Sequence, residues 1–141
     1  PYGGGSLGVF KGMTAIACHA YMTSKLPNRF PDLRWGFIEA SSQWLPWVIL
    51  EAKKRYRTLE REWPENVMKK HGMFVTCENS DDLPYVVKEA GEDCLVIGTD
   101  YGHTDTSSDV DAIKVFSERD DLTTTVKQKI LSDNSCRLYG L

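Results

Sequence analysis

The sequence lacks the features that mark several common classes of protein. None of its apolar runs approaches the roughly 20 residues needed to span a bilayer, and it has no recognisable signal peptide. The formal net charge is -3, which argues against nucleic acid or an anionic membrane as the main partner. The glycine-rich stretch 1–8 reads as a loop without the G-x-x-x-x-G-K pattern that cradles phosphates. We therefore expect no membrane and no nucleic acid among its partners.

Cysteine and histidine are sparse, and neither forms a metal-binding pair along the chain. The four cysteines are widely spaced and include no C-x-x-C, so a zinc ribbon is not expected. Cys77 and Cys94 lie in apolar, strand-like runs, where buried free thiols are common. No His-x-His occurs among the three histidines. We expect reduced thiols and a cytoplasmic location.

The composition is that of one compact domain. Of the 141 residues, 41% are hydrophobic and 26% are charged, which is enough to build a sizeable core without low-complexity segments. We expect a single unit over residues 1–141, with no internal domain boundary. Because the chain opens with Pro1 and not with Met, we also expect that upstream sequence is missing.

Three short apolar runs read as strands, and an acidic residue follows each. The runs are 35–38, 73–77 and 95–97, and the acids are Glu39, Glu78 and Asp100. Helical segments separate the runs, and this alternation predicts a parallel sheet with right-handed crossovers. Three such strands match part of a (β/α)₈ barrel or a small open sheet, since a whole barrel needs at least about 200 residues.

The other apolar residues recur at helical intervals. We expect helices over 9–26, from a cap at Ser41 or Ser42 to before Pro64, from a cap at Asp81 or Asp82 to Gly91, over about 108–118, and over 122–131. In the first of these, Pro27 is the expected stop. Its apolar stripe consists of Val9, Met13, Ile16 and Ala20, with His19 at the edge.

Asp100 is the ionisable residue that stands out. It follows the most completely apolar run, at the end of the strand where α/β proteins gather their chemistry. On the local pattern alone, the alternative is that Asp100 caps a turn or a helix, as most such aspartates do.

Three segments resemble the amidohydrolase-related group of the amidohydrolase superfamily, which includes aminocarboxymuconate-semialdehyde decarboxylase and its hydrolase relatives. They are GVFKGMTAIACHAYMTSKLPNRFPDLRWGFIEASSQWLPWVI around strand six, DCLVIGTDYGHTD at strand eight, and KILSDNSCRLYGL at the closing helix. The segments occur in the family's order and span nearly the whole chain. The resemblance implies an α/β fold that forms the carboxyl-terminal portion of a (β/α)₈ TIM barrel, about three β/α units comprising strands six to eight.

The resemblance also implies a divalent metal ion, often zinc, at the carboxyl ends of the strands. Its ligands in the family typically come from a His-x-His or Glu-x-His pair on strand one, a His on strand five and the strand-eight Asp, here Asp100. Glu39 stands where strand six often ends in a His, and we expect it as a second ligand. Asp100 and His103 are the expected catalytic residues, and Gly102 replaces the usual Pro between them. The expected substrate-binding residues are Trp44, Tyr101 and His19.

The function implied is a metal-dependent hydrolase or decarboxylase (a carboxy-lyase) that acts on a small carbonyl or carboxylate substrate. Asp100 would be both metal ligand and proton shuttle, because a carboxylate is a hard oxygen ligand that can accept a proton from activated water. The remainder of the barrel is the expected partner, with a homo-oligomer as a further possibility. The alternative is a non-catalytic α/β module or inactive barrel fragment, which the missing His-x-His favours if nothing lies upstream.

Overall fold

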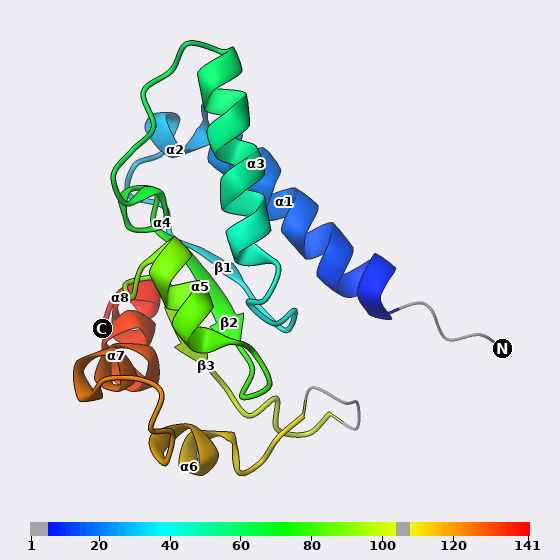
Figure 1. Cartoon of the computed structure of the whole chain (residues 1–141), viewed down its shortest axis with the longest axis vertical. Helices are drawn as coiled ribbons and strands as arrows, with labels where there is room; N and C mark the ends of the chain where they lie inside the picture. Colours follow the sequence, from blue (N-terminus) through cyan, green and yellow to red (C-terminus); the bar gives the residue numbers. More distant parts are fainter. Residues whose placement is uncertain (1–5, 104–107) are drawn as a thin grey trace, which may run out of the picture.

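The computed structural model describes residues 6–103 and 108–141. Three parallel strands form one sheet in the order β1-β2-β3, with β1 at Trp35–Phe37, β2 at Met73–Cys77 and β3 at Leu95–Ile97. Helix α3 (Leu45–Thr58) follows β1, and helix α5 (Leu83–Ala90) follows β2 (Figure 1). The predicted α/β class with a parallel sheet is confirmed, and β1 is one residue shorter than expected.

Helix α3 shows why its sequence folds against the core. Pro46 lies in its first turn, where a missing N–H costs little. Its buried residues recur at helical intervals, and the charged residues from 51 to 62, in its second half and just after it, are mostly exposed. The buried set is Leu45, Pro46, Val48, Ile49, Ala52 and Tyr56. This face packs against α1 (Met13–Thr23) and α5, and residues of all three helices join residues of the sheet in one hydrophobic core.

The first helical region differs from the prediction at both ends. A π-helical segment, η1 (Ser6–Gly12), leads directly into α1, so the predicted loop 1–8 is wrong at residues 6–8, while 1–5 lie outside the described residues. Helix α1 ends at Thr23 because the chain turns extended at Ser24, whose hydroxyl donates to Tyr21 O (2.9 Å) and accepts from Leu26 N (3.0 Å). Pro27 is therefore not the stop. It lies in the first turn of a separate helix, α2 (Leu26–Arg29).

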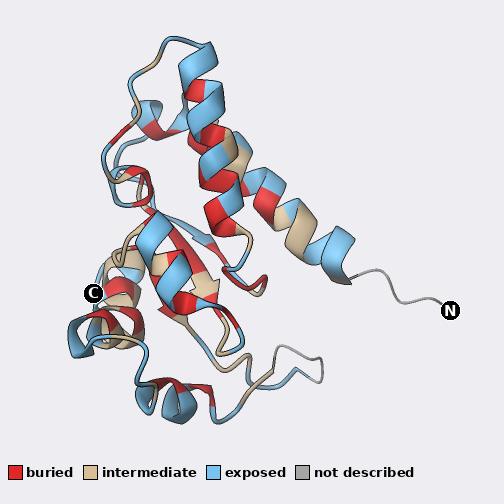
Figure 2. Cartoon of the chain, in the orientation of Figure 1, coloured by how far each residue is buried: buried red, intermediate tan, exposed pale blue. Residues whose placement is uncertain are grey.

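The predicted apolar stripe, which begins in η1 and continues in α1, is exposed. Val9, Met13 and Ile16 are 64%, 59% and 63% exposed, and Ala20 is also exposed. The buried side of the helix consists instead of Ala15, Cys18, Tyr21 and Met22. Figure 2 shows exposed, intermediate and buried residues mixed along η1 and α1, with exposed residues towards the amino-terminal end of this helical arm. The four stripe residues, called the α1 stripe below, thus present apolar surface that no described element covers.

Several short helices differ from the segments predicted from the sequence. Helix α4 (Val67–Lys70) is capped by Asn66, whose side chain accepts from Lys69 N. The predicted helix 108–118 begins only at α6 (Ala112–Ser117), since Asp109 N bonds Thr99 O and keeps 108–111 in a loop. The predicted helix 122–131 divides into α7 (Thr124–Gln128) and η2 (Lys129–Asp133), and α8 (Asn134–Tyr139) follows.

The ends of α5 decide between two predicted caps. The Asp82 carboxylate accepts from Tyr85 N at 3.2 Å, so Asp82 and not Asp81 is the cap. The helix ends at Gly91, as predicted; this glycine has φ +86° and ψ 162°, which lies outside the left-handed helical region common at helix ends. Asp81 is left for another role.

All four cysteine thiols are unpaired, and Cys18, Cys77 and Cys94 are buried. Burial raises the pKa of the Cys77 thiol to about 12, with a smaller contribution from the charge of Asp81. Burial raises the pKa of the Cys94 thiol to about 12 in the same way. These thiols are therefore packing groups in the core. Among the described helices, none is long and apolar enough to cross a membrane.

Candidate metal centre

Three potential metal ligands converge at the carboxyl edge of the sheet. Glu39 follows β1 by two residues, Asp100 follows β3 by three, and His103 lies in the turn after Asp100. One ligand atom from each of the three lies within 4.8 Å of the other two. The parallel topology brings them together, because parallel strands end at the same edge.

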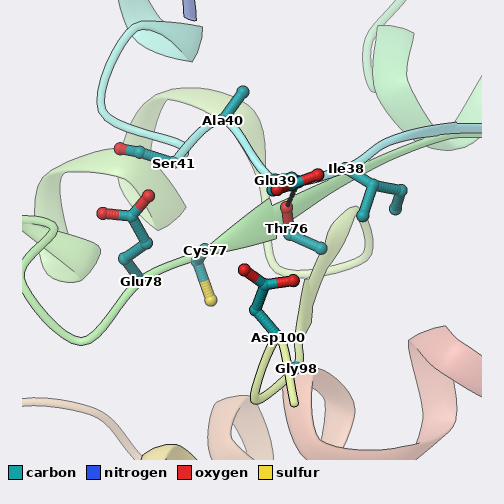
Figure 3. Close-up of a pocket in the computed structure, with 9 residues that line it drawn as sticks. All are labelled: Ile38, Glu39, Ala40, Ser41, Thr76, Cys77, Glu78, Gly98 and Asp100. Atoms are coloured by element: carbon teal, nitrogen blue, oxygen red, sulfur yellow. Dashed lines mark hydrogen bonds between the residues drawn. The ribbon is translucent and has the colours of Figure 1, made fainter. Parts of the chain in front are cut away.

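Both carboxylates are presented by unusual backbone. Glu39 has φ +65° and Asp100 has φ +50°, a left-handed conformation that costs a non-glycine residue about 1–3 kcal/mol when the surroundings enforce it. The Glu39 N–H donates to Thr76 Oγ1 at 2.8 Å, which ties it to β2 (Figure 3). The Asp100 carbonyl accepts from His103 N and from Ser108 Oγ, both at 3.2 Å. The chain thus holds both residues in place by bonds to neighbouring elements.

His103 bridges the two carboxylates. Its Nδ1 lies 3.2 Å from Glu39 Oε1 and 3.1 Å from Asp100 Oδ1. Gly102 shapes the turn that brings it there, with φ +95°, a value that proline, fixed near φ −65°, cannot adopt. A proline at position 102, which the resemblance implies is usual in the family, could not form this turn with the same backbone.

The three side chains fit a divalent metal ion. A tetrahedral ion bound at about 2.0–2.2 Å separates its ligand atoms by about 3.3–3.6 Å. The two Nδ1-to-oxygen distances of 3.2 and 3.1 Å are close to that spacing. Two carboxylate oxygens and an imidazole nitrogen form a donor set that zinc and several other first-row divalent ions accept. These residues could hold part of the coordination sphere of one such ion.

Comparison with known proteins agrees with this architecture. No protein-family model and no curated protein matches the sequence. Among solved structures, an amidohydrolase from Mycobacterium avium subsp. paratuberculosis matches 92% of this chain with a TM-score of 0.71 and 24% sequence identity. The fold is that of part of an amidohydrolase. The matched region is 34% of that protein's chain, so the present chain spans about a third of its length.

The amidohydrolase match confirms the prediction of a partial barrel, since the open three-stranded sheet corresponds to part of one. At its carboxyl edge lies a pocket of about 90 Å³. Figure 3 shows Glu39 and Asp100 on one side of it, around Thr76, with Ser41 and Glu78 on the other. Lys11 of η1 reaches this edge and pairs with Glu78 Oε1 at 3.2 Å. Sequence reasoning missed Lys11, because the pair joins residues far apart in the chain.

The predicted substrate-binding residues occupy three different places. Tyr101 adjoins Asp100 and is 86% exposed. Trp44 packs partly against the core, and its indole N–H donates to Ala40 O at 2.9 Å. His19 lines a separate pocket between α1 and α3, near Trp47. Among the described residues, Tyr101, Trp44 and His19 all lie outside the wall of the pocket between Glu39 and Asp100. Their substrate-binding role stays a prediction.

Proposed function

We propose that this protein is a metal-dependent enzyme of the amidohydrolase type, acting by hydrolysis or decarboxylation on a small carbonyl or carboxylate substrate. The observation that carries the proposal is the convergence of Glu39, Asp100 and His103 at the carboxyl edge of an amidohydrolase-like sheet. The proposed metal is a divalent ion, with zinc the first choice because the donor set mixes imidazole and carboxylate. The four unpaired cysteines support a reducing, cytoplasmic setting as part of the proposal.

The residues of this chain would divide the work between binding and proton transfer. Glu39, Asp100 and His103 would hold the ion, which when bound supplies Lewis-acid polarisation and activates water near neutral pH. Asp100 would accept a proton from the attacking water and return it to the leaving group in a hydrolysis. In a decarboxylation, where the bond to CO₂ breaks, Asp100 would deliver a proton to the carbon left with the electron pair.

A non-catalytic role is the alternative, and one observation favours it. His103 already bonds both carboxylates, so the three side chains could serve only to tie the loops after β1 and β3 together. The absence of a His-x-His pair from these 141 residues points the same way only if no upstream segment supplies one. Metal binding separates the two readings, since a structural ion pair requires no metal.

We also propose that the main partner of this chain is the remainder of a barrel. Each outer strand of the sheet, β1 and β3, pairs on one side only among the described strands, and exposed strand edges are normally covered. The α1 stripe lies on η1 and α1, which come before α2 and β1 in the chain, and three of its residues are about 60% exposed. We infer that a preceding β/α unit of the same barrel covers the stripe and the free edge of β1.

Metal content tests the proposed function. The intact protein, stripped with a chelator and titrated with Zn²⁺ in a calorimeter, should bind zinc stoichiometrically. Asp100→Asn, which keeps the shape but removes the charge, should weaken binding by at least tenfold. Asp111→Asn is the matched control, because Asp111 is an exposed carboxylate of the same loop region outside the cluster. Parent-like affinity in folded Asp100→Asn, or no zinc binding by the parent, would overturn the proposed metal centre.

A further inference from the structure

Asp81 is a buried carboxylate whose hydrogen-bond partners are all neutral. It is 6% exposed, and among the described residues no cation forms an ion pair with it. Its Oδ1 accepts from Ser41 Oγ at 2.5 Å. Its Oδ2 accepts from Ser42 N and Ser42 Oγ, both at 2.8 Å, and from Glu78 N at 3.0 Å. Four donors use essentially the whole accepting capacity of a carboxylate.

These bonds join the two loops that border the candidate metal centre. Ser41 and Ser42 belong to the loop after β1, which also carries Glu39, and Glu78 begins the loop after β2. A parallel link between the same loops runs from Asp82 N to Gln43 Oε1 at 2.7 Å. The loop with Glu39 is therefore fixed from one side by Thr76 and from the other by Asp81.

The fixed loop holds strained backbone. Ser41 has φ +59° and Glu39 has φ +65°, and non-glycine residues keep such conformations only where their surroundings enforce them. Ser41 is 5% exposed and Ser42 is fully buried, so solvent cannot replace Asp81 as their acceptor. Without Asp81, the loop would be free to relax and carry the Glu39 carboxylate away from Asp100 and His103.

We propose that Asp81 is a positioning residue, which fixes the loop after β1 so that Glu39 completes the metal centre. The inference rests on the proposed function, because it needs the centre to bind metal. Asp81 does not touch the pocket between Glu39 and Asp100, and its role is separate from helix capping, which Asp82 performs. Of the two adjacent aspartates, Asp82 caps helix α5 and Asp81 fixes the loop that carries Glu39.

The experiment compares Asp81→Asn with Asp82→Asn in the intact protein, using Zn²⁺ and Co²⁺ as probes. An asparagine at 81 cannot accept from all four donors, whereas at 82 it remains a good helix cap. Zinc affinity should fall about 10- to 100-fold in Asp81→Asn, the range typical for residues that orient metal ligands, and stay near the parent value in Asp82→Asn. The visible absorption of bound Co²⁺ should change only in Asp81→Asn, because the coordination geometry changes.

The outcomes separate this inference from the proposed function. Folded Asp81→Asn with parent-like zinc affinity and an unchanged Co²⁺ spectrum overturns the positioning role alone. If the parent protein binds no metal, both the proposed metal centre and the positioning role of Asp81 are overturned. If circular dichroism shows that Asp81→Asn does not fold, Ser42→Ala decides, because it removes one of the four bonds. A several-fold weaker affinity and a shifted Co²⁺ spectrum in Ser42→Ala support the proposal, and parent values in both overturn it.

Discussion

Replacing Asn134 with alanine should destabilise the fold more than any exposed change in the same helix. Asn134 is fully buried where η2 meets α8. Its Nδ2 donates to Leu95 O at 2.7 Å and to Glu92 O at 2.9 Å, and its Oδ1 accepts from Arg137 at 3.3 Å. One side chain therefore docks the closing helices onto β3.

The magnitude follows from these contacts. Two hydrogen bonds are worth about 1 kcal/mol each, and a buried carbonyl left without a donor at Leu95 adds about 1–3 kcal/mol. The expected loss is about 2–4 kcal/mol when partial relaxation is allowed for. For a chain of this size, that loss lowers the melting temperature by about 8–16 °C. It is a large part of the roughly 5–15 kcal/mol that stabilises a typical domain.

Urea unfolding followed by circular dichroism measures the loss, with Tyr139→Ala as the control, since Tyr139 lies on the same helix and is 69% exposed. Asn134→Asp sharpens the test. A charged carboxylate cannot donate to the two carbonyls, so this near-isosteric variant should be at least as unstable near pH 7 and should recover in part when acid protonates it. A loss below about 1 kcal/mol in Asn134→Ala would refute the docking role.

Further predictions concern the site and the surface. Asp100→Asn should lower turnover of the intact enzyme by at least about 10²–10⁴-fold while the fold survives, as steady-state kinetics on folded protein would measure. Trp44→Phe should change substrate affinity more than stability, measured as KM against melting temperature. Ile16→Lys should reduce self-association of the 141-residue chain, seen by analytical ultracentrifugation, because it places a charge in the exposed α1 stripe. Burial, together with the charges of Lys70 and Arg61, lowers the pKa of His71 below 6.5. The free energy of unfolding should therefore fall as the pH drops through 6.5 towards the folded-state pKa and then level off. His71→Gln should flatten this pH profile.

Each of these predictions has an outcome that contradicts it. Turnover within a few-fold of the parent in metal-loaded Asp100→Asn would return that residue to a turn role. A large loss of stability with normal kinetics would make Trp44 a core anchor. A parent chain that is already monomeric and unfolds cooperatively would contradict self-association through the α1 stripe. An unaltered pH profile in His71→Gln would assign the acid sensitivity to other groups.

The strands were predictable from the sequence because their signal is local. The run 73–77 is apolar enough to identify β2 with its observed bounds, Met73–Cys77. The buried face of α1 was not predictable in the same way. Val9, Met13 and Ile16 form the clearer apolar pattern, yet the helix buries Ala15 and Cys18. Periodicity identifies an amphipathic helix, but which apolar side is covered depends on what packs against it.

In the candidate site, too, some residues were predictable from the local sequence and others were not. Glu39 and Asp100 were predictable because each follows a strand, and parallel strands end together. Asp81 was not, because its partners Ser41 and Ser42 lie about 40 residues away in the sequence. In the sequence, Asp81 and Asp82 are equivalent helix caps, and only the approach of two loops distinguishes them. Contacts of this kind belong to the tertiary structure and leave no local pattern.

The buried thiols give the chain built-in reporters of local opening. Cys18 lies on α1, Cys77 at the end of β2 and Cys94 just before β3, and each is almost inaccessible while its surroundings are closed. A thiol with its pKa near 12, as at Cys77 and Cys94, is protonated and inert towards alkylating agents until the segment opens. Pulse alkylation read by mass spectrometry would therefore time the opening of the α1 arm separately from that of the sheet, with no label introduced. Cys136, which is partly exposed, would react first and set the reference rate.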